Sequence, residues 1–277
     1  MVISIHKITG QEIMYQKEEI ILKVENIHLA YDRLILRDVS FEVHNITRPN
    51  LQQGQVVSLI GRSGIGKTQL FKILSGLQNP TSGKVLIGSD LHPVVEGEVG
   101  IVPQNYILFN HRSILDNLNL GLRGSINKLN DHEKIELINK YASKFGLSEH
   151  LKKYPMQLSG GQRQRVSIIQ QILTGNKFIL LDEPFSGLDP VIKDKVVELL
   201  INISELDELN TLVIVSHDLE NSLAISDTAF ILANQENQEG ATITEKIDLM
   251  EMGLTWDREI KTKKKFQDLV AEMKFKM

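Results

Sequence analysis

The chain alternates between short apolar runs and segments in which apolar residues recur at helical spacing. The apolar runs are typical of strands buried on both faces of a sheet, and they are QVVSLI (55–60), FILLD (178–182), TLVIVS (211–216) and TAFILA (228–233). The helical segments are LFKILSGL (70–77), GQRQRVSIIQQIL (161–173), VIKDKVVELLINI (191–203) and DLENSLAI (218–225). Strands that alternate with helices predict an α/β fold with a mostly parallel sheet and helices on its faces.

The N-terminal part has a different pattern, in which apolar and polar residues are interleaved. Residues 19–44 predict two antiparallel strands around a turn near Asp32. Residues 45–54 predict a loop or a lengthened hairpin, and two further apolar runs, 84–88 and 99–103, predict short strands.

The pattern of apolar residues changes at residues 112–155, which predict a block of helices. Asp131 can cap a helix, and the apolar residues expected to share one face of that helix are Ile135, Ile138, Ala142 and Phe145. This block predicts a subdomain inserted into the α/β alternation.

Composition excludes several classes of protein. With 31 basic and 35 acidic residues, the net charge is -4, so no overall basic field attracts nucleic acid. The absence of cysteine excludes disulfides, thiolate catalysis and cysteine-ligated metals, and it fits a reducing compartment. The N-terminal residues lack the pattern of a signal peptide, and no apolar run reaches the length of a membrane-spanning helix.

Residues 61–68 (GRSGIGKT) place glycines, a lysine and a hydroxyl between a predicted strand and a predicted helix. The glycines allow successive N–H groups to turn around phosphate oxygens, and the helix adds the positive end of its dipole. Lys67 can reach the terminal phosphates, and the hydroxyl of Thr68 can ligate Mg²⁺. A glycine-rich turn with an incidental lysine is the alternative, but the flanking strand and helix favour a phosphate loop.

The strand FILLDE ends in two acids, Asp182 and Glu183. If it lies beside the phosphate-loop strand, Asp182 meets Mg²⁺ directly or through water, and Glu183 points at an attacking water. One carboxylate then binds the metal, and the other accepts a proton. Without the upstream phosphate loop, the two acids would indicate only a solvated turn.

The stretch LSGGQ (158–162) stands just before a predicted helix. Free N–H groups and the hydroxyl of Ser159 can form a second anion site there. A capped helix start with a flexible Gly-Gly pair is the alternative. The chain therefore offers two candidate phosphate-binding helix ends.

Together these motifs resemble the ATP-binding cassette of the ABC transporter family. The resemblance covers roughly residues 20–235, and its ordered motifs are GRSGIGKT, VPQN with Gln104, LSGGQ, FILLDE, SGLD with Asp189, and SH with His217. It implies a P-loop NTPase cassette with a mostly parallel RecA-like core sheet, an N-terminal antiparallel β subdomain and an α-helical subdomain.

The resemblance also implies how the chain is divided. Residues 1–18 form an N-terminal extension, and residues 19–237 form the ATP-binding domain, with its helical subdomain at about 105–157. Residues 238–277 form a short basic C-terminal extension. A helix that packs one side on the body is expected there from the spacing of Phe266, Leu269, Val270 and Met273, and contact with a membrane surface is the alternative.

For activity, the resemblance implies an ATPase that uses ATP and Mg²⁺ and dimerises head to tail. Ser159 and Gly161 would touch the γ-phosphate bound by the opposite subunit. Glu183 would be the general base, with His217 orienting the γ-phosphate and water. The nucleotide contacts expected are Tyr31, Gly61, Arg62, Ser63, Gly64, Ile65, Gly66, Lys67, Thr68, Gln69, Ser159, Gly160, Gly161, Gln162 and Asp189.

The metal contacts expected from the same resemblance are Thr68, Gln104 and Asp182. Gln104 would also sense the attacking water, Asp189 would link the two sites of the dimer, and Tyr31 would stack on adenine. Simpler alternatives remain for single residues, such as a helix cap for Asp189, strand packing for Tyr31, a strand-end amide for Gln104 and a neutral loop histidine for His217. Gln69 stands where the family commonly has a second hydroxyl, and it can still donate to an α-phosphate.

The expected function is ATP-driven transport, with import favoured. The expected partners are a second cassette, separate transmembrane permease subunits that receive the helical subdomain, and a solute-binding protein. The chain would then lie in the cytoplasm, on the inner face of the membrane. The alternatives are a non-transport ABC ATPase of a cell-division or cluster-assembly machine and a nucleic-acid-associated ABC protein, and the acidic charge and the single cassette disfavour the latter.

Overall fold

The computed structural model describes residues 3–8, 11–48, 54–123, 129–204, 211–255 and 257–277. Its strands are β1 (Ile3–Ile8), β2 (Gln11–Ala30), β3 (Leu34–Thr47), β4 (Gln55–Ile60), β5 (Ser82–Ile87), β6 (His92–Pro93), β7 (Gly100–Val102), β8 (Phe178–Asp182), β9 (Thr211–Ser216), β10 (Thr228–Asn234) and β11 (Ala241–Asp248). Its α-helices are α1 (Lys67–Leu74), α2 (Ile114–Arg123), α3 (Asp131–Lys144), α4 (Gly160–Leu173), α5 (Pro190–Ser204), α6 (Leu219–Ile225) and α7 (Lys264–Lys276). Short 3₁₀ helices are η1 (Ser148–His150), η2 (Pro155–Gln157) and η3 (Ile260–Thr262).

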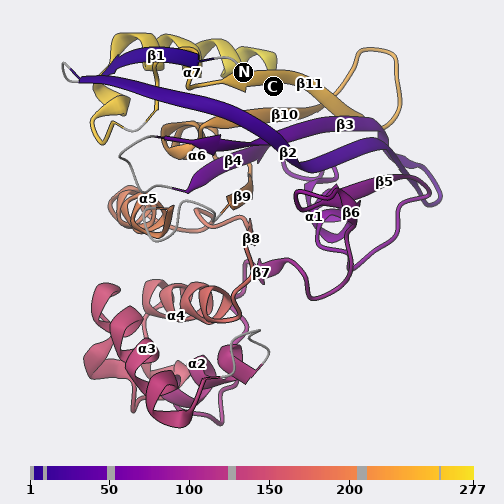
Figure 1. Ribbon diagram of the computed structural model, residues 1–277. Coiled ribbons are helices and arrows are strands. Elements are labelled where there is room, and N and C mark those ends of the chain that lie inside the picture. The colour runs from indigo at the N-terminus through magenta and orange to yellow at the C-terminus, as the bar shows by residue number, and fades with distance from the viewer. Residues whose placement is uncertain (1–2, 9–10, 49–53, 124–128, 205–210, 256) are drawn as a thin grey trace.

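The strands form one mixed sheet in the order β6-β5-β2-β3-β11-β10-β4-β9-β8-β7, with β1 paired to β2 (Figure 1). The half from β7 to β10 is parallel, as the alternation of strands and helices predicts. The other half is antiparallel and includes the predicted hairpin of β2 and β3. The two halves meet where β11 pairs with β10 and touches β3. The α/β fold with an antiparallel N-terminal part is thus confirmed.

The central strands are apolar because both of their faces are covered. Every residue of β4 and β9 is buried. Along β9, Val213 and Val215 join the hydrophobic cluster that contains Leu70 of α1. Leu212 and Ile214 join the cluster on the opposite face, which contains Leu200 of α5. This alternation follows from the two-residue period of a strand.

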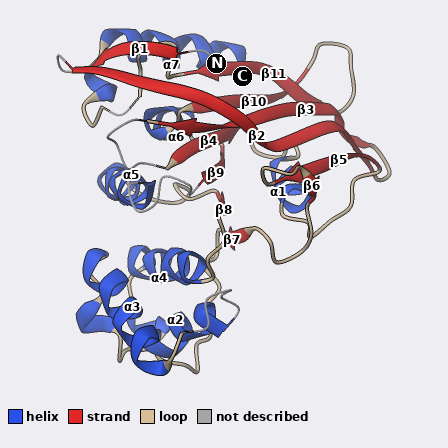
Figure 2. Cartoon of the chain, viewed as in Figure 1, coloured by secondary structure: helices blue, strands red, loops and turns tan. Residues whose placement is uncertain are grey.

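The helical block lies at one end of the molecule, where α2, α3 and α4 pack together (Figure 2). Asn130, and not Asp131, caps α3, because its backbone is extended and its side chain accepts the N–H of Glu133. Ile138 and Phe145 are buried as expected, but Ile135, in the first turns of the helix, remains 50% exposed.

Of the two alternatives for residues 45–54, the lengthened hairpin is correct for residues 45–47. Strand β3 continues to Thr47 because β2 extends in register beside it, with Gln16 opposite Thr47. Arg48 then lies buried and pairs with Asp227 at 3.1 Å. The rest of the expected loop, residues 49–53, lies outside the described residues.

The predicted amphipathic helix at the C-terminal end is confirmed as α7. Its apolar residues Phe266, Leu269, Val270 and Met273 are all buried. They pack on Leu219 and Leu223 of α6 in one cluster. Burial of a large apolar side chain contributes about 1.5–3 kcal/mol, so this face explains why the segment docks on the body.

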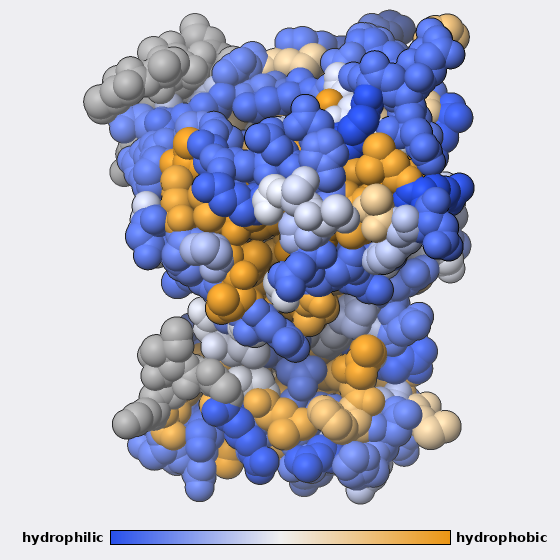
Figure 3. Space-filling model, turned by 90° about the vertical axis from the view of Figure 1, so that its right-hand side faces the viewer, coloured by the Kyte–Doolittle hydropathy of each residue, from blue (hydrophilic) through white to orange (hydrophobic). Residues whose placement is uncertain are grey.

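The molecule is narrowed between the sheet and the helical block, and apolar atoms reach the surface on both sides of this waist (Figure 3). Among the helices of the described residues, none has both the length and the hydropathy that crossing a membrane requires.

Candidate functional site

The loop between β4 and α1 has the geometry that its glycines predict. Gly64 and Gly66 adopt φ values of 79° and 111°, in the left-handed region that favours glycine. A Cβ on Gly61 would lie 2.6 Å from the carbonyl oxygen of Leu232. Gly66 immediately precedes α1, which begins at Lys67. The loop therefore presents bare backbone at a helix N-terminus, as a phosphate site requires.

Lys67 is almost fully buried and lies across this loop. Its Nζ donates to the carbonyl oxygens of Gly61 at 2.8 Å and Arg62 at 3.1 Å. It also lies 3.2 Å from Oε1 of Glu183. The first predicted motif and the acidic end of β8 are thus brought into direct contact.

Glu183 is held by the loop that follows β9. Its Oε2 accepts hydrogen bonds from the backbone N–H of His217 at 3.2 Å and from Oγ of Ser216 at 3.3 Å. The Nδ1 atom of His217 lies 2.7 Å from the same oxygen. Glu183 has a φ of 49°, an uncommon conformation for a residue with a side chain. Such backbone strain is characteristic of functional sites.

Asp182 carries a buried oxygen that suits a cation. Its Oδ1 has no hydrogen-bond partner among the described residues. Burial, and then the neighbouring charge of Glu183, raise the pKa of Asp182. A buried carboxylate without a partner is unfavourable, and a divalent cation would supply that partner. The donor set of Asp182 and the Thr68 hydroxyl therefore fits Mg²⁺.

Lys67, Thr68, Gln104, Glu183 and His217 share one pocket of about 410 Å³, and Asp182 is not among its lining residues. The pocket is lined by Ile35, Ser63, Gly64, Gly66, Lys67, Thr68, Gln69, Gln104, Glu183, Ser186 and His217. Residues from five separate motifs are thus brought together. Ser186 was not predicted, although it lies in the quoted SGLD stretch, and it accepts a hydrogen bond from Nε2 of Gln104 at 3.2 Å. Ile35 had no sequence signal.

Tyr31 stands at the exposed side of the same loop and is 60% exposed. Its hydroxyl donates to Oε1 of Gln69 at 3.2 Å and accepts from Nε2 of Gln78 at 2.8 Å. The alternative of Tyr31 as ordinary strand packing does not fit this exposure. Gln78 was missed, since no motif marks it.

The LSGGQ stretch forms the start of α4. Ser159 is the N-cap, and its side chain and that of Gln162 make a reciprocal capping box. Gly160 and Gly161 line a second cavity of about 430 Å³, together with Ser159, Gln164, Arg165, Leu188, Ile192, Lys195, Val196 and Leu199. Among the described residues, the two cavities share no lining residue. One chain therefore does not bring LSGGQ to its own phosphate loop.

Asp189 lies before α5 and caps it. Its Oδ1 accepts the backbone N–H of Ile192 at 3.1 Å. The helix-cap alternative is thus correct, and it leaves the second oxygen of the carboxylate for a further contact.

Comparisons with known proteins give a consistent picture. The family model described as ABC transporter matches residues 44–186. The chain is 33% identical over 225 residues to the thiamine import ATP-binding protein ThiQ of Yersinia pseudotuberculosis, with 80% of this chain and 90% of that protein covered. It is 32% identical over 235 residues to the sulfate/thiosulfate import ATP-binding protein CysA of Mesorhizobium japonicum, with 82% of this chain but only 65% of the relative covered.

Solved structures agree in fold. A cbiO1 structure from Clostridium perfringens, part of the ABC transporter complex cbiONQ, superposes with a TM-score of 0.71 at 23% identity and covers 93% of this chain and 100% of that one. A dimeric ATP-binding cassette in a post-hydrolysis state with ADP and Pi has a TM-score of 0.65 at 24% identity, covering 82% and 98%. At these identities the likeness establishes the fold.

Proposed function

Because the chain belongs to the ABC transporter family, we propose that it is the ATP-binding and ATP-hydrolysing subunit of an importer. It is an ATPase of the ABC type that uses ATP and Mg²⁺. The observation that carries this proposal is the single pocket in which Lys67 of the phosphate loop, Glu183, His217 and Gln104 meet. The importer function has its support in the relatives, which include import proteins for thiamine and for sulfate or thiosulfate.

The phosphates of ATP bind to the loop of residues 61–69, with Lys67 as the main cation. The hydroxyl of Thr68, the Asp182 carboxylate and Gln104 hold Mg²⁺, which neutralises charge on the phosphates. Tyr31 stacks on the adenine ring, and the hydroxyl contacts with Gln69 and Gln78 hold its side chain in one orientation.

Glu183 acts as the general base toward the attacking water. Its carboxylate already accepts hydrogen bonds from the loop of His217, so the base has one fixed orientation. His217 orients the γ-phosphate and the water beside it, and Gln104 contacts Mg²⁺ and the same water.

A second cassette completes the site. Ser159, Gly160 and Gly161 line a cavity separate from the phosphate loop, and Gln162 closes the capping box with Ser159. This stretch therefore serves the nucleotide of the opposite subunit. Asp189 links the two sites across the interface. Loss of the γ-phosphate on hydrolysis removes the contacts that favour the closed dimer, which then opens.

Membrane permease subunits contact the helical subdomain, residues 105–157, and hold the cassette at the inner face of the membrane. Large apolar side chains are exposed there, with Ile107 at 71% and Met156 at 81%. Such exposure of apolar surface is typical of an interaction site. A solute-binding protein completes an importer of this kind.

The proposal is tested in two steps. Purified protein should hydrolyse Mg-ATP, and purification of the native complex should recover a polytopic membrane protein. Absence of hydrolysis with the chain folded would contradict the enzyme assignment. Recovery of soluble partners alone would contradict transport and favour a non-transport machine.

A further inference from the structure

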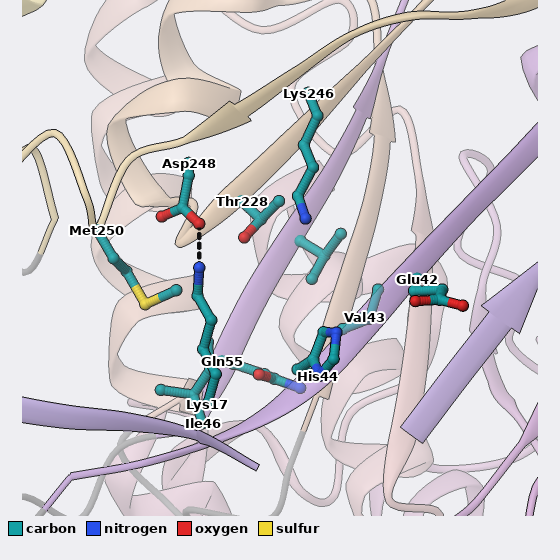
Figure 4. A pocket seen from close by; sticks show the side chains of 11 residues that line it. Lys17, Glu42, Val43, His44, Ile46, Gln55, Thr228, Lys246, Asp248 and Met250 are labelled. Carbon is teal, nitrogen blue, oxygen red and sulfur yellow. Dashed lines mark hydrogen bonds and ion pairs between the residues drawn. The ribbon is translucent and has the colours of Figure 1, made fainter. Parts of the chain in front are cut away.

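The two terminal extensions contact each other on the body of the protein. Lys17 of β2 donates to Asp248 at the end of β11 (Figure 4), and it also donates to Glu251 at 2.8 Å. Tyr15 is buried in one cluster with Ile46 and Met250. The part of the C-terminal extension that follows β11 is therefore attached at its start, and α7 attaches its far end to α6.

Between these two attachments, Lys261 of η3 reaches helices that begin beside the candidate site. Its Nζ donates to Oδ1 of Asp194 on α5 at 2.6 Å. The same atom donates to Oδ1 of Asn221 on α6 at 2.7 Å. One ammonium group of the extension thus joins α5 to α6.

The contacts continue to the residue that follows His217. The side chain of Asn221 donates to Oδ1 of Asp218 at 3.0 Å, and Lys193 of α5 donates to Oδ2 of Asp218 at 2.7 Å. Burial by itself would raise the pKa of Asp218, but the hydrogen bonds from Lys193 and Asn221 outweigh it and hold that pKa below its usual value. Asp218 is therefore a fixed anion at the start of α6.

The hydrogen-bonded network of Lys261, Asn221, Asp218 and Lys193 reaches loops of the candidate site at both of its ends. Asp218 is the N-cap of α6, and its N–H donates to Oγ of Ser216 at 3.0 Å, the hydroxyl that donates to Glu183. Lys193 lies in the first turn of α5, where its N–H is bonded to the carbonyl of Asp189. The network thus connects the loop of His217 to the loop of Asp189.

We propose that Lys261 is a positioning residue, through which the C-terminal extension holds the loop of His217 and Glu183 in its hydrolytic geometry. This inference rests on the proposed ATPase function. Lys261 touches neither of these two residues directly and acts through Asn221 and Asp218. The contact of Lys261 with Asp194 lies at the surface, where an ion pair contributes little to stability. We therefore assign Lys261 a role in orienting the loop and not in stabilising the fold.

The test compares full-length Lys261→Ala, Lys261→Arg and Lys264→Ala with the wild type. Lys264 is the matched control, because among the described residues its ion pair is with Asp268 one turn along α7, and its side chain is 83% exposed. We expect Lys261→Ala to lower kcat for Mg-ATP hydrolysis about tenfold, with the KM for ATP and the melting temperature nearly unchanged. Arginine keeps the charge and the donors and should restore most of kcat. Lys264→Ala should stay within about twofold of the wild type.

Amide hydrogen exchange gives a readout that needs no catalysis. Exchange in residues 217–222 should be faster in Lys261→Ala than in the wild type and Lys264→Ala. Unchanged exchange there overturns the proposal, as does a loss of kcat that arginine fails to restore and that accompanies a lower melting temperature. If the wild type does not hydrolyse ATP, the proposed function fails, while the exchange comparison still decides the role of Lys261.

Discussion

The Nζ atom of Lys67 lies 3.2 Å from one carboxylate oxygen of Glu183, and Nδ1 of His217 lies 2.7 Å from the other. The cation proposed for phosphate and the proposed base therefore form one ion pair. A phosphate group that enters the pocket competes with Glu183 for the ammonium group of Lys67. Binding of the nucleotide and release of the base are linked by this contact.

Replacing Lys67 by alanine should abolish measurable nucleotide binding. The phosphates lose their main cation, and the partly buried carboxylate of Glu183 loses the ammonium group beside its Oε1. We expect ATP affinity to fall at least about a hundredfold, or roughly 3 kcal/mol. Titration with a fluorescent ATP analogue measures this, and wild-type affinity would contradict the assignment of the loop.

Glu183→Gln should bind ATP but hydrolyse it about 10²- to 10⁴-fold more slowly, the usual contribution of a general base. The amide keeps the shape of the side chain and releases Lys67 from its ion pair. A closed dimer should therefore accumulate with Mg-ATP. Size-exclusion chromatography detects it, and a purely monomeric elution profile would count against the mechanism.

Ser159→Arg should leave ATP affinity within about threefold of the wild type and eliminate turnover. Ser159 lines a cavity that shares no residue with the nucleotide pocket of its own chain. The bulky cation therefore blocks the contact with the other subunit and does not reach the nucleotide pocket of its own chain. Normal turnover in this variant would mean that one chain completes the site unaided.

Gln78→Ala should raise the KM for ATP about threefold and leave kcat unchanged. Gln78 donates to the hydroxyl of Tyr31 at 2.8 Å, so its removal frees the ring without deleting it. A hydrogen bond of this kind contributes about 0.5–1.5 kcal/mol. Tyr31→Phe removes the bonds to both Gln69 and Gln78 and should have at least this effect, and Tyr31→Ala should exceed it. Equal KM values in all of these variants and the wild type would remove Tyr31 from the nucleotide site.

Asp182→Asn should raise the melting temperature without Mg²⁺ by about 2 °C, because it removes a half-buried charge whose buried Oδ1 has no hydrogen-bond partner among the described residues. The same variant should lose most of the additional stabilisation that Mg-ATP gives the wild type. Differential scanning calorimetry with and without Mg-ATP measures both effects. Full stabilisation by Mg-ATP would exclude Asp182 from the metal site.

The sequence by itself determined the features that depend on neighbouring residues. Continuous apolar runs specify strands that are buried on both faces, and β4 and β9 are buried along their whole length. The glycines of residues 61–66 specify a turn that few other residues could adopt. Motifs of this kind carry their own geometry. Residues from five of the six motifs line the candidate nucleotide pocket, and those of LSGGQ line a separate cavity.

Only the tertiary structure decided the contacts between distant segments. The bonds of Gln78 to Tyr31 and of Gln104 to Ser186 join residues that no periodicity relates. The contact of Lys261 with Asn221 likewise requires the C-terminal extension to dock first. Asn130 caps α3 because the backbone is extended at that residue. Side-chain pairing across a fold depends on which surfaces meet, and local sequence patterns do not contain that information.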